Sequence, residues 1–246
     1  MVGPILVVLS LATLLTACGS SAPAAPPSSQ GIVENRAVPD QIPLVDASGH
    51  ATDLGAFRGK YVVMAPFLSL CQDECPLVTG AFIALQHDVE AAGLGKQVVF
   101  MEITVDPQRD TPARLAAYSA RFGADWTMLT GTPANLANLW KFFGVAVQVV
   151  PEDQPPKLDW WLGTPLTYDV DHTDGYILLD RQGHERFVDA SAPNLHGHLD
   201  KPLTGLLNAG GLKNLDHQQG ASWSLSDAVA SISWLVGRTI PSVATT

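Results

Sequence analysis

The feature that most constrains the fold is an unbroken apolar run followed by two closely spaced cysteines. The run, at residues 61–67, has the composition of a strand buried on both faces. Cys71 and Cys75 follow it, and Pro76 then begins a segment whose apolar residues recur at helical spacing. The sequence therefore predicts a strand, a cysteine loop and a helix in immediate succession.

Extended and helical patterns alternate along the rest of the chain. The expected strands are at residues 43–46, 61–67, 97–104, 126–129, 176–179 and 185–188, and the expected helices at residues 76–93, 111–122, 132–143 and after Ser224 or Ser226. Strands alternating with helices and ending in a hairpin are typical of an α/β domain with a central sheet flanked by helices. Periodicity alone does not separate a thioredoxin-like arrangement from other α/β folds.

The N-terminal segment has the pattern of a targeting signal. Its apolar run at residues 5–15 is too short to span a bilayer comfortably, and the string Leu-Thr-Ala-Cys that ends at Cys18 is similar to a bacterial lipobox, whose cysteine is acylated. We expect a lipoprotein signal at 1–18, a tether rich in Ser, Ala and Pro at 19–37, and one domain at 38–246. The domain would then be extracytoplasmic and held at the bacterial cell membrane by lipidated Cys18. An ordinary secretory signal is the alternative.

The charge of the chain limits its partners. The formal net charge is -10 and the isoelectric point about 4.9. Nucleic acid binding requires a basic surface, so it is excluded as a function. An acidic chain is compatible with cation handling or with a basic partner.

The cysteine pair has three possible roles when it is considered by itself. Two cysteines of an exported protein often form a structural disulfide, whereas a thioredoxin-type redox dithiol has two residues between its cysteines and this loop has three. Thiolates are also soft ligands for Cu(I) or Zn²⁺, and either ion would need a further ligand. His172 stands directly before the strand expected at 176–179, which makes convergence with Cys71 and Cys75 at one sheet edge plausible.

Two opposing effects are expected on the thiols. The N-terminus of the following helix stabilises thiolate, whereas the like charges of Asp73 and Glu74 are expected to raise the thiol pKa. On that expectation a peroxidase, which needs a reactive thiolate, is disfavoured.

Four segments together resemble the Sco/SenC family, whose members assist the assembly of cytochrome c oxidase. They are Cys-Gln-Asp-Glu-Cys-Pro at 71–76, Thr-Val-Asp-Pro-Gln-Arg-Asp-Thr-Pro at 104–112, Leu-Thr-Gly at 129–131 and Tyr-Asp-Val-Asp-His at 168–172. They occur in the order and at the separations of that family, over roughly residues 39–201. Their joint occurrence is far more specific than any one of them.

The resemblance implies a thioredoxin-like fold, with a central mixed sheet and an inserted hairpin or loop, and a copper site. Copper, as Cu(I) or alternatively Cu(II), would be bound by Cys71, Cys75 and His172. The implied function is that of a metallochaperone rather than an enzyme, delivering copper to the binuclear site of cytochrome c oxidase subunit II. The alternative is a thiol-disulfide oxidoreductase, in which Cys71 and Cys75 reduce the client's copper-site cysteines and an extracytoplasmic thiol reductant regenerates them.

The segment 145–171, with Trp160 and Trp161, is long for a structureless loop, so we expect a functional loop or a local hairpin there. It is longer and more aromatic than the family resemblance implies. The chain also lacks an internal repeat.

Several other residues are expected to be structural. Asp106 and Asp110 are expected to bind backbone amides, and Arg109 to pair with a carboxylate. His196 and His198 flank a glycine, and we expect solvated surface histidines rather than a weak divalent metal site. His87 is likewise expected at the surface, while Met64 and Met101 are expected in the core.

Overall fold

The computed structural model describes residues 31–218 and 220–242. The expected signal peptide, its Cys18 and most of the expected tether lie outside the described residues. Within the tether range, however, residues Ile32–Ala37 form strand β1, which pairs antiparallel with β10 (His184–Asp189). The folded domain therefore starts before residue 38. Most β1 side chains are exposed. The sequence of β1 therefore has no apolar run that would indicate a strand.

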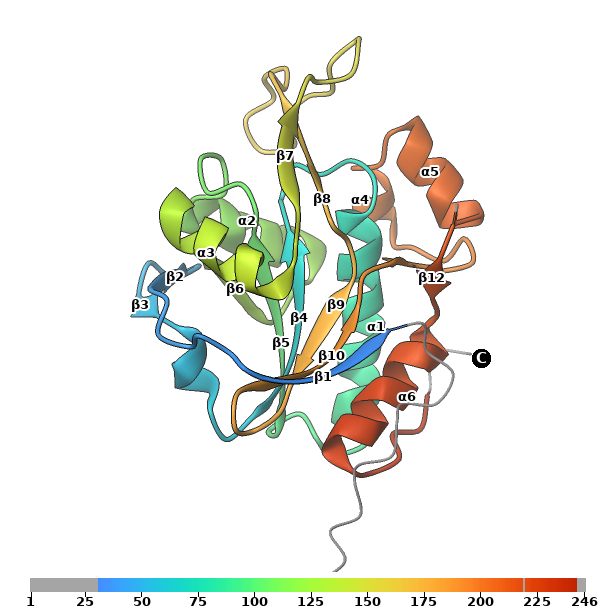
Figure 1. Ribbon diagram of the computed structural model, residues 1–246. Helices are drawn as coiled ribbons and strands as arrows, with labels where there is room; N and C mark the ends of the chain where they lie inside the picture. Colours follow the sequence, from blue (N-terminus) through green and yellow to red (C-terminus); the bar gives the residue numbers. More distant parts are fainter. Residues whose placement is uncertain (1–30, 219, 243–246) are drawn as a thin grey trace, which may run out of the picture.

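The centre of the domain is a mixed sheet that has eight strands among the described residues, in the order β1-β10-β9-β4-β5-β6-β2-β3 (Figure 1). The remaining strands are β2 (Leu44–Asp46), β3 (Ala51–Thr52), β4 (Tyr61–Phe67), β5 (Val98–Thr104), β6 (Thr127–Thr130) and β9 (Tyr176–Leu179). β4, β5 and β6 are parallel, and β9 and β10 continue the sheet in antiparallel pairing. The sequence prediction of a thioredoxin-like α/β fold with a mixed sheet is confirmed.

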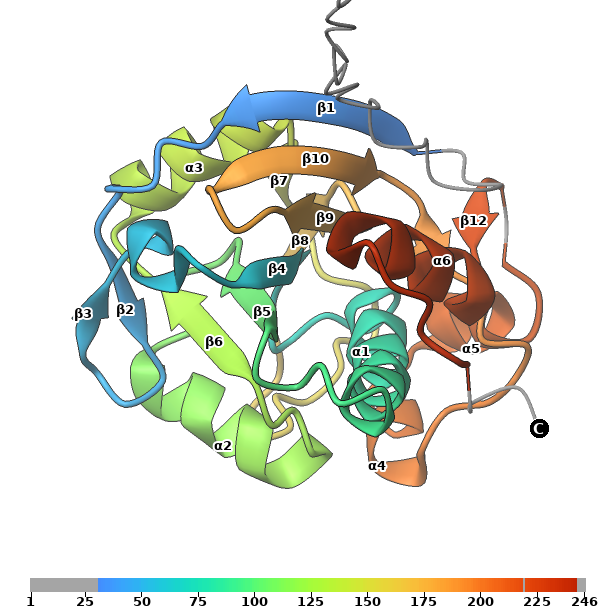
Figure 2. The same ribbon diagram turned by 90° about the horizontal axis from the view of Figure 1, so that it is seen from below.

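Helices cover both faces of this sheet (Figure 2). α1 (Cys75–Ala91), α2 (Pro112–Phe122) and α6 (Leu225–Val236) lie on one face, and α3 (Pro133–Phe143) lies on the other. Neighbouring β4 residues alternate between the faces: Val63 packs in the cluster around α1 and α6, whereas Met64 packs in the cluster that contains the apolar side chains of α3. This double coverage explains the unbroken apolar run of β4.

The chain between α3 and β9 forms an arm that extends beyond the sheet (Figure 1). Its strands β7 (Val147–Val150) and β8 (Asp169–His172) pair antiparallel, which confirms the expected local hairpin. β8 leads into β9 after a short turn, and β9 is the neighbour of β4. The end of β8 therefore lies at the same sheet edge as the cysteine loop that follows β4.

The C-terminal quarter adds elements that no sequence pattern indicated. They are α4 (Lys201–Thr204), α5 (Ala209–Asp216) and the short parallel pair β11 (Ala192–Pro193) and β12 (Ser222–Trp223). Ser224 is the N-cap of α6, one of the two caps expected for the last helix. A short 3₁₀ helix, η1 (Leu54–Phe57), precedes β4. In the part of the chain that the structure describes, no helix has both the length and the apolar character needed to cross a membrane.

Candidate metal centre

The two cysteines meet at the start of α1. Cys75 is the first residue of the helix, and Pro76 follows it in the first turn. Backbone N–H groups in the first turn have no partner within the helix, so a proline there removes no helical hydrogen bond. The backbone N–H of Cys75 donates to Sγ of Cys71 at 3.3 Å. Both cysteines are free thiols; Cys71 is half-buried and Cys75 is only 2% exposed. Cys71 is thus the more accessible sulfur of the pair.

His172 joins the pair from the end of β8. Its Nε2 lies 3.3 Å from Sγ of Cys75, and its Nδ1 lies 3.0 Å from the carbonyl oxygen of Thr173. Because a carbonyl only accepts hydrogen bonds, Nδ1 carries a hydrogen and donates it. The ring is thereby oriented with Nε2 toward the sulfur atoms, as in metal sites whose histidines are held by a backbone carbonyl.

The pKa values of the two thiols move in opposite directions. Hydrogen bonding with Cys75 lowers the pKa of Cys71 against the effect of burial, and the hydrogen bond and charge of His172 lower it further. Burial, followed by the hydrogen bond and charge of Cys71, raises the pKa of Cys75. Burial alone would lower the pKa of His172, but its interactions with Cys71 raise it to about 9. These shifts make the Cys71 thiol easier to ionise and make His172 hold its proton more tightly.

This corrects one expectation from the sequence. The like charges of Asp73 and Glu74 were expected to raise the thiol pKa, yet the pKa of Cys71 is lowered. The reason is that Cys75 and His172 contact the Cys71 sulfur, and the backbone of Asp73 also hydrogen-bonds to it. The repulsion between the negative charges of Cys71 and Glu74 affects the pKa of Glu74 instead. That pKa is raised to about 7, mainly by burial and in part by the charge of Cys71. The expectation of a raised thiol pKa is therefore wrong for Cys71, whereas the pKa of Cys75 is raised by burial.

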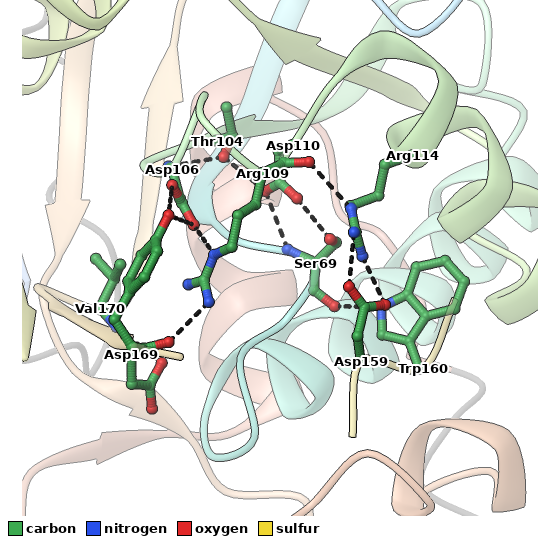
Figure 3. Close-up of polar contacts among 11 residues, drawn as sticks. Ser69, Thr104, Asp106, Arg109, Asp110, Arg114, Asp159, Trp160, Asp169 and Val170 are labelled. Carbon is green, nitrogen blue, oxygen red and sulfur yellow. Dashed lines mark hydrogen bonds and ion pairs between the residues drawn. The ribbon is translucent and has the colours of Figure 1, made fainter. Parts of the chain in front are cut away.

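A polar network fixes the cysteine loop to the segment that follows β5 (Figure 3). The carboxylate of Asp110 accepts from the amide and the hydroxyl of Ser69, and also from the hydroxyl of Thr104 at 2.6 Å. Asp110 is 1% exposed. Its predicted role as an acceptor for a backbone amide is confirmed, and that amide lies two residues before Cys71.

The same segment holds the arm (Figure 3). Arg109 pairs with Asp106, donates to the carbonyl oxygen of Tyr168 at 2.7 Å and lies over the Tyr168 ring. The predicted carboxylate partner of Arg109 is thus confirmed. Asp106 differs from the expectation, because its carboxylate accepts from Arg109 and from the Tyr168 hydroxyl instead of backbone amides. Segment 104–110 therefore links the cysteine loop to the strand that carries His172.

A second link was not indicated by the sequence. Arg114 donates to both carboxylate oxygens of Asp159, at 2.9 and 2.7 Å, and both side chains are almost fully buried. The neighbouring Trp160 donates its indole N–H to the carbonyl oxygen of Ser69 at 2.7 Å (Figure 3). Asp159 and Trp160 belong to the irregular part of the arm, where no periodicity reveals which side chains point inward.

The other residues singled out in the sequence lie away from the centre. His196, His198 and His87 are exposed, which agrees with their expected surface positions. Met64 and Met101 are fully buried in the core, as expected.

The donors do not form a finished metal site. Among the described residues, no group of three or more His, Cys, Asp or Glu side chains is arranged so that it could hold an ion as it stands. Cys71, Cys75 and His172 are instead hydrogen-bonded to one another. Two sulfurs and one imidazole are the donor types that suit Cu(I), and such donors must exchange their protons for the metal.

Comparison with curated proteins relates the chain to several known proteins. The chain is 29% identical over 140 residues to the mitochondrial SCO2 homolog of Bos taurus, a match covering 57% of the chain and 49% of that protein. It is 27% identical over 168 residues to a putative copper-binding protein of Stutzerimonas stutzeri, covering 68% and 71%. The chain therefore spans about half the length of the bovine relative.

Solved structures give the same result. The copper-bound structure of ScoI from Bradyrhizobium japonicum matches with 25% identity and a TM-score of 0.50, over 72% of this chain and 96% of that one. Copper-bound ScoI from Arabidopsis thaliana, at 21% identity and a TM-score of 0.52 over 71% and 94%, supports the fold. The SCO1/SenC family model matches residues 34–195, which include both cysteines and His172. The chain belongs to the SCO1/SenC family.

Proposed function

We propose that the protein is an extracytoplasmic copper metallochaperone in which Cys71, Cys75 and His172 hold one Cu(I) ion. Its client would be the binuclear copper site of cytochrome c oxidase subunit II. The observation that carries the proposal is the contact of Cys75 Sγ with His172 Nε2 at 3.3 Å, beside the Cys71 sulfur. Relatives described as copper-binding or solved with copper bound support it.

The donor set fits copper as a transferable cargo. To accept the ion, the Cys75 thiol and His172 Nε2 each give up a proton, and the lowered pKa of Cys71 makes its thiolate easier to form. The Thr173 carbonyl keeps the imidazole oriented during this exchange. Cys71 is the more exposed of the two sulfur donors, so an incoming client thiolate would approach from its side.

The opposite pKa shifts favour a second function, a thiol-disulfide oxidoreductase. Cys71 thiolate would attack a client disulfide, forming a mixed disulfide as the other client sulfur leaves as thiolate. Cys75, once deprotonated, would then attack the Cys71 sulfur and release the second client thiolate. The client gains two electrons, and this chain is left with a Cys71–Cys75 disulfide that an extracytoplasmic thiol reductant must reduce.

The membrane location belongs to the proposal as well. Acylation of Cys18 would anchor the domain to the outer face of the cell membrane. Incorporation of radiolabelled palmitate, with Cys18→Ala as the control, tests this anchor. Labelling that persists in Cys18→Ala would contradict it.

Anaerobic Cu(I) titration against bicinchoninate tests the copper site. The full chain would carry Cys18→Ser, so that Cys71 and Cys75 are its only thiols. We expect one tightly bound Cu(I). Each of Cys71→Ser, Cys75→Ser and His172→Ala removes a proposed ligand and should lower the affinity by more than the roughly 10- to 100-fold typical for the loss of an outer-shell partner. His198→Ala, which changes an exposed histidine away from the centre, is the matched control. If the parent chain binds no more tightly than the three variants, copper carriage is wrong.

A further inference from the structure

A cavity of about 260 Å³ opens beside Cys71. Cys71 lines it, whereas Cys75 and His172 do not. One wall comes from the arm, through Lys157 and Trp160, and a second wall comes from the segment that includes α4, through Leu206. The more accessible thiol of the centre therefore has a defined space in front of it.

The second wall lies outside the family match, which ends at residue 195. It is nevertheless fastened to the cysteine loop, since the amide of Asn208 donates to the carbonyl oxygen of Gln72 at 2.8 Å. Nζ of Lys157 donates to the carbonyl oxygens of Leu206 and Leu207, which ties this wall to the arm. The cavity is thus completed by a segment beyond the family match, and backbone hydrogen bonds hold that segment in place.

The lining is apolar with a cationic side. Leu70, Phe122 and Trp160 contribute apolar surface, and the Trp160 ring is held in place by its hydrogen bond to Ser69. Arg121 and Lys157 also line the cavity, and no Asp or Glu among the described residues does. This is unusual in a chain with a net charge of -10.

The two cationic side chains, Lys157 and Arg121, differ in the partners that they already have. The ammonium group of Lys157 already donates hydrogen bonds to two backbone carbonyl oxygens. Arg121 is exposed, its guanidinium lies over the rings of Phe122 and Trp160, and within the described residues it forms no ion pair. Arg121 is therefore available to an anionic group that enters the cavity together with an apolar one.

We propose that this cavity binds the thiol-bearing segment of the client, and that it selects a peptide whose cysteine is followed by a large apolar residue and then an acidic one. The inference rests on the proposed function and names the chemistry of its partner. The apolar side chain would fill the space between Trp160 and Leu206, and the carboxylate would pair with Arg121. The client sulfur would then stand at Cys71, where ligand exchange or disulfide exchange takes place.

Mixed-disulfide formation measures this selectivity without copper. The full chain with Cys18→Ser and Cys75→Ser retains only Cys71. Three pentapeptides, each with its cysteine activated as a thionitrobenzoate disulfide, have cysteine followed by Phe-Asp, Gly-Asp or Phe-Lys. Cys71 thiolate attacks the peptide sulfur, the peptide–Cys71 bond forms, and coloured thionitrobenzoate leaves with the electron pair.

We expect the Phe-Asp peptide to react about tenfold faster than either of the others. Burial of the Phe side chain and the contact of Asp with Arg121 can each supply the free energy that a tenfold difference requires. Arg121→Glu should reverse the preference between Phe-Asp and Phe-Lys, and Leu206→Ser should remove the advantage of Phe-Asp over Gly-Asp. Lys213→Glu, a charge reversal on the exposed side of α5, should change neither preference. Iodoacetamide, a small uncharged alkylating reagent, should react equally with all variants, which shows that Cys71 is intact.

Equal rates for the three peptides, or a preference that survives Arg121→Glu, would overturn the inference. If equal rates accompany tight Cu(I) binding by the parent chain, this inference alone fails. If the peptide preference is found but copper is not bound, the chaperone proposal fails and the cavity serves disulfide exchange.

Discussion

Sγ of Cys75 lies 3.3 Å from Nε2 of His172, although 97 positions separate the two residues in the chain. The cysteine begins α1, and the histidine ends the second strand of the arm. Their contact depends on β4 and β9 being neighbours in the sheet. A small change in either segment is therefore expected to alter the centre.

Replacing this histidine separates the two candidate functions. In His172→Ala we expect Cu(I) affinity to fall by more than the roughly 10- to 100-fold typical for the loss of an outer-shell partner, because one of the three proposed donors is lost. Reduction of a peptide disulfide at pH 8 should fall much less, since both sulfurs remain. Copper titration and disulfide reduction on the same preparation provide the measurement. Equal losses in both assays would contradict the assignment of His172 as a ligand.

The reactivity of Cys71 should depend on pH through its lowered pKa. As pH rises through that pKa, thiolate forms and alkylation by iodoacetamide accelerates, so in the parent chain the rise should lie below the range of an ordinary thiol. His172→Ala removes a hydrogen bond and a positive charge that favour the thiolate, so the rise should move to higher pH. The experiment uses the Cys18→Ser background, which keeps the hydrogen bond from Cys75, and follows alkylation of Cys71 by peptide mass analysis with and without His172→Ala. Identical profiles would show that the ring does not stabilise the thiolate.

A buried carboxyl beneath α1 should make folding stability depend on pH. Glu102 is fully buried, accepts from Thr79 at 2.9 Å and from the Trp126 indole at 3.2 Å, and burial raises its pKa to about 8. The folded state therefore binds this proton more tightly than the unfolded state, so its contribution to stability is full below about pH 4.5 and is lost as pH rises toward 8.

Glu102→Gln keeps the shape of the protonated acid and removes this titration. The variant should gain about 2 kcal/mol or more over the parent at pH 8 and little at pH 5. Urea unfolding at both pH values measures the difference. A gain that is the same at both pH values would show that Glu102 does not titrate in this range.

The pair that holds the arm should contribute strongly to stability. Asp159→Asn leaves the buried Arg114 without its charge partner, and such a loss costs about 3–5 kcal/mol. Asp40→Asn provides the control, because Arg58 of that pair is half exposed, and it should cost less than about 1 kcal/mol. Urea unfolding of both variants tests the contrast. Equal costs would mean that the Arg114–Asp159 pair is not buried in solution.

Packing of α5 on the cysteine loop leaves no room at one glycine. A Cβ at Gly211 would lie 2.7 Å from the carbonyl oxygen of Gln72 and 3.0 Å from Cα of Asp73. Gly211→Ala should therefore lower the free energy of unfolding, by about 1–3 kcal/mol, despite the better helix propensity of alanine. Gly210→Ala meets only side-chain oxygens at 3.1 and 3.3 Å and should be tolerated. Thermal unfolding of both variants distinguishes them, and a stabilised Gly211→Ala would contradict this packing.

The sequence predicted the elements that have strong periodicity or caps. β4 occupies the predicted residues 61–67, and α2 and α3 begin after the capping residues Thr111 and Thr132. The histidine beside the cysteines also followed from family motifs and from its place before β9. These features are local, or are carried by short motifs, so they can be read without knowledge of distant contacts.

Other features depend on contacts between distant segments and could not be read from the sequence. β1 is held by backbone pairing with β10, and its exposed side chains have no apolar alternation. α5 is short and is fixed by contacts such as that of Asn214 with Asp73 and Glu74. The direction of the Cys71 pKa shift likewise required the positions of Cys75 and His172, because like charges nearby in sequence were less important than groups in contact.

Segment 104–110 is hydrogen-bonded both to Ser69, two residues before Cys71, and to Tyr168, the residue directly before the strand that ends in His172. One short stretch of chain therefore sets how far the sulfur donors stand from the imidazole. Substitutions there can widen or narrow that separation without touching any donor atom. Two relatives with the same cysteines and histidine can for this reason differ in how tightly they retain a metal and how readily they release it. Comparing donor residues alone would miss that difference during evolution or redesign.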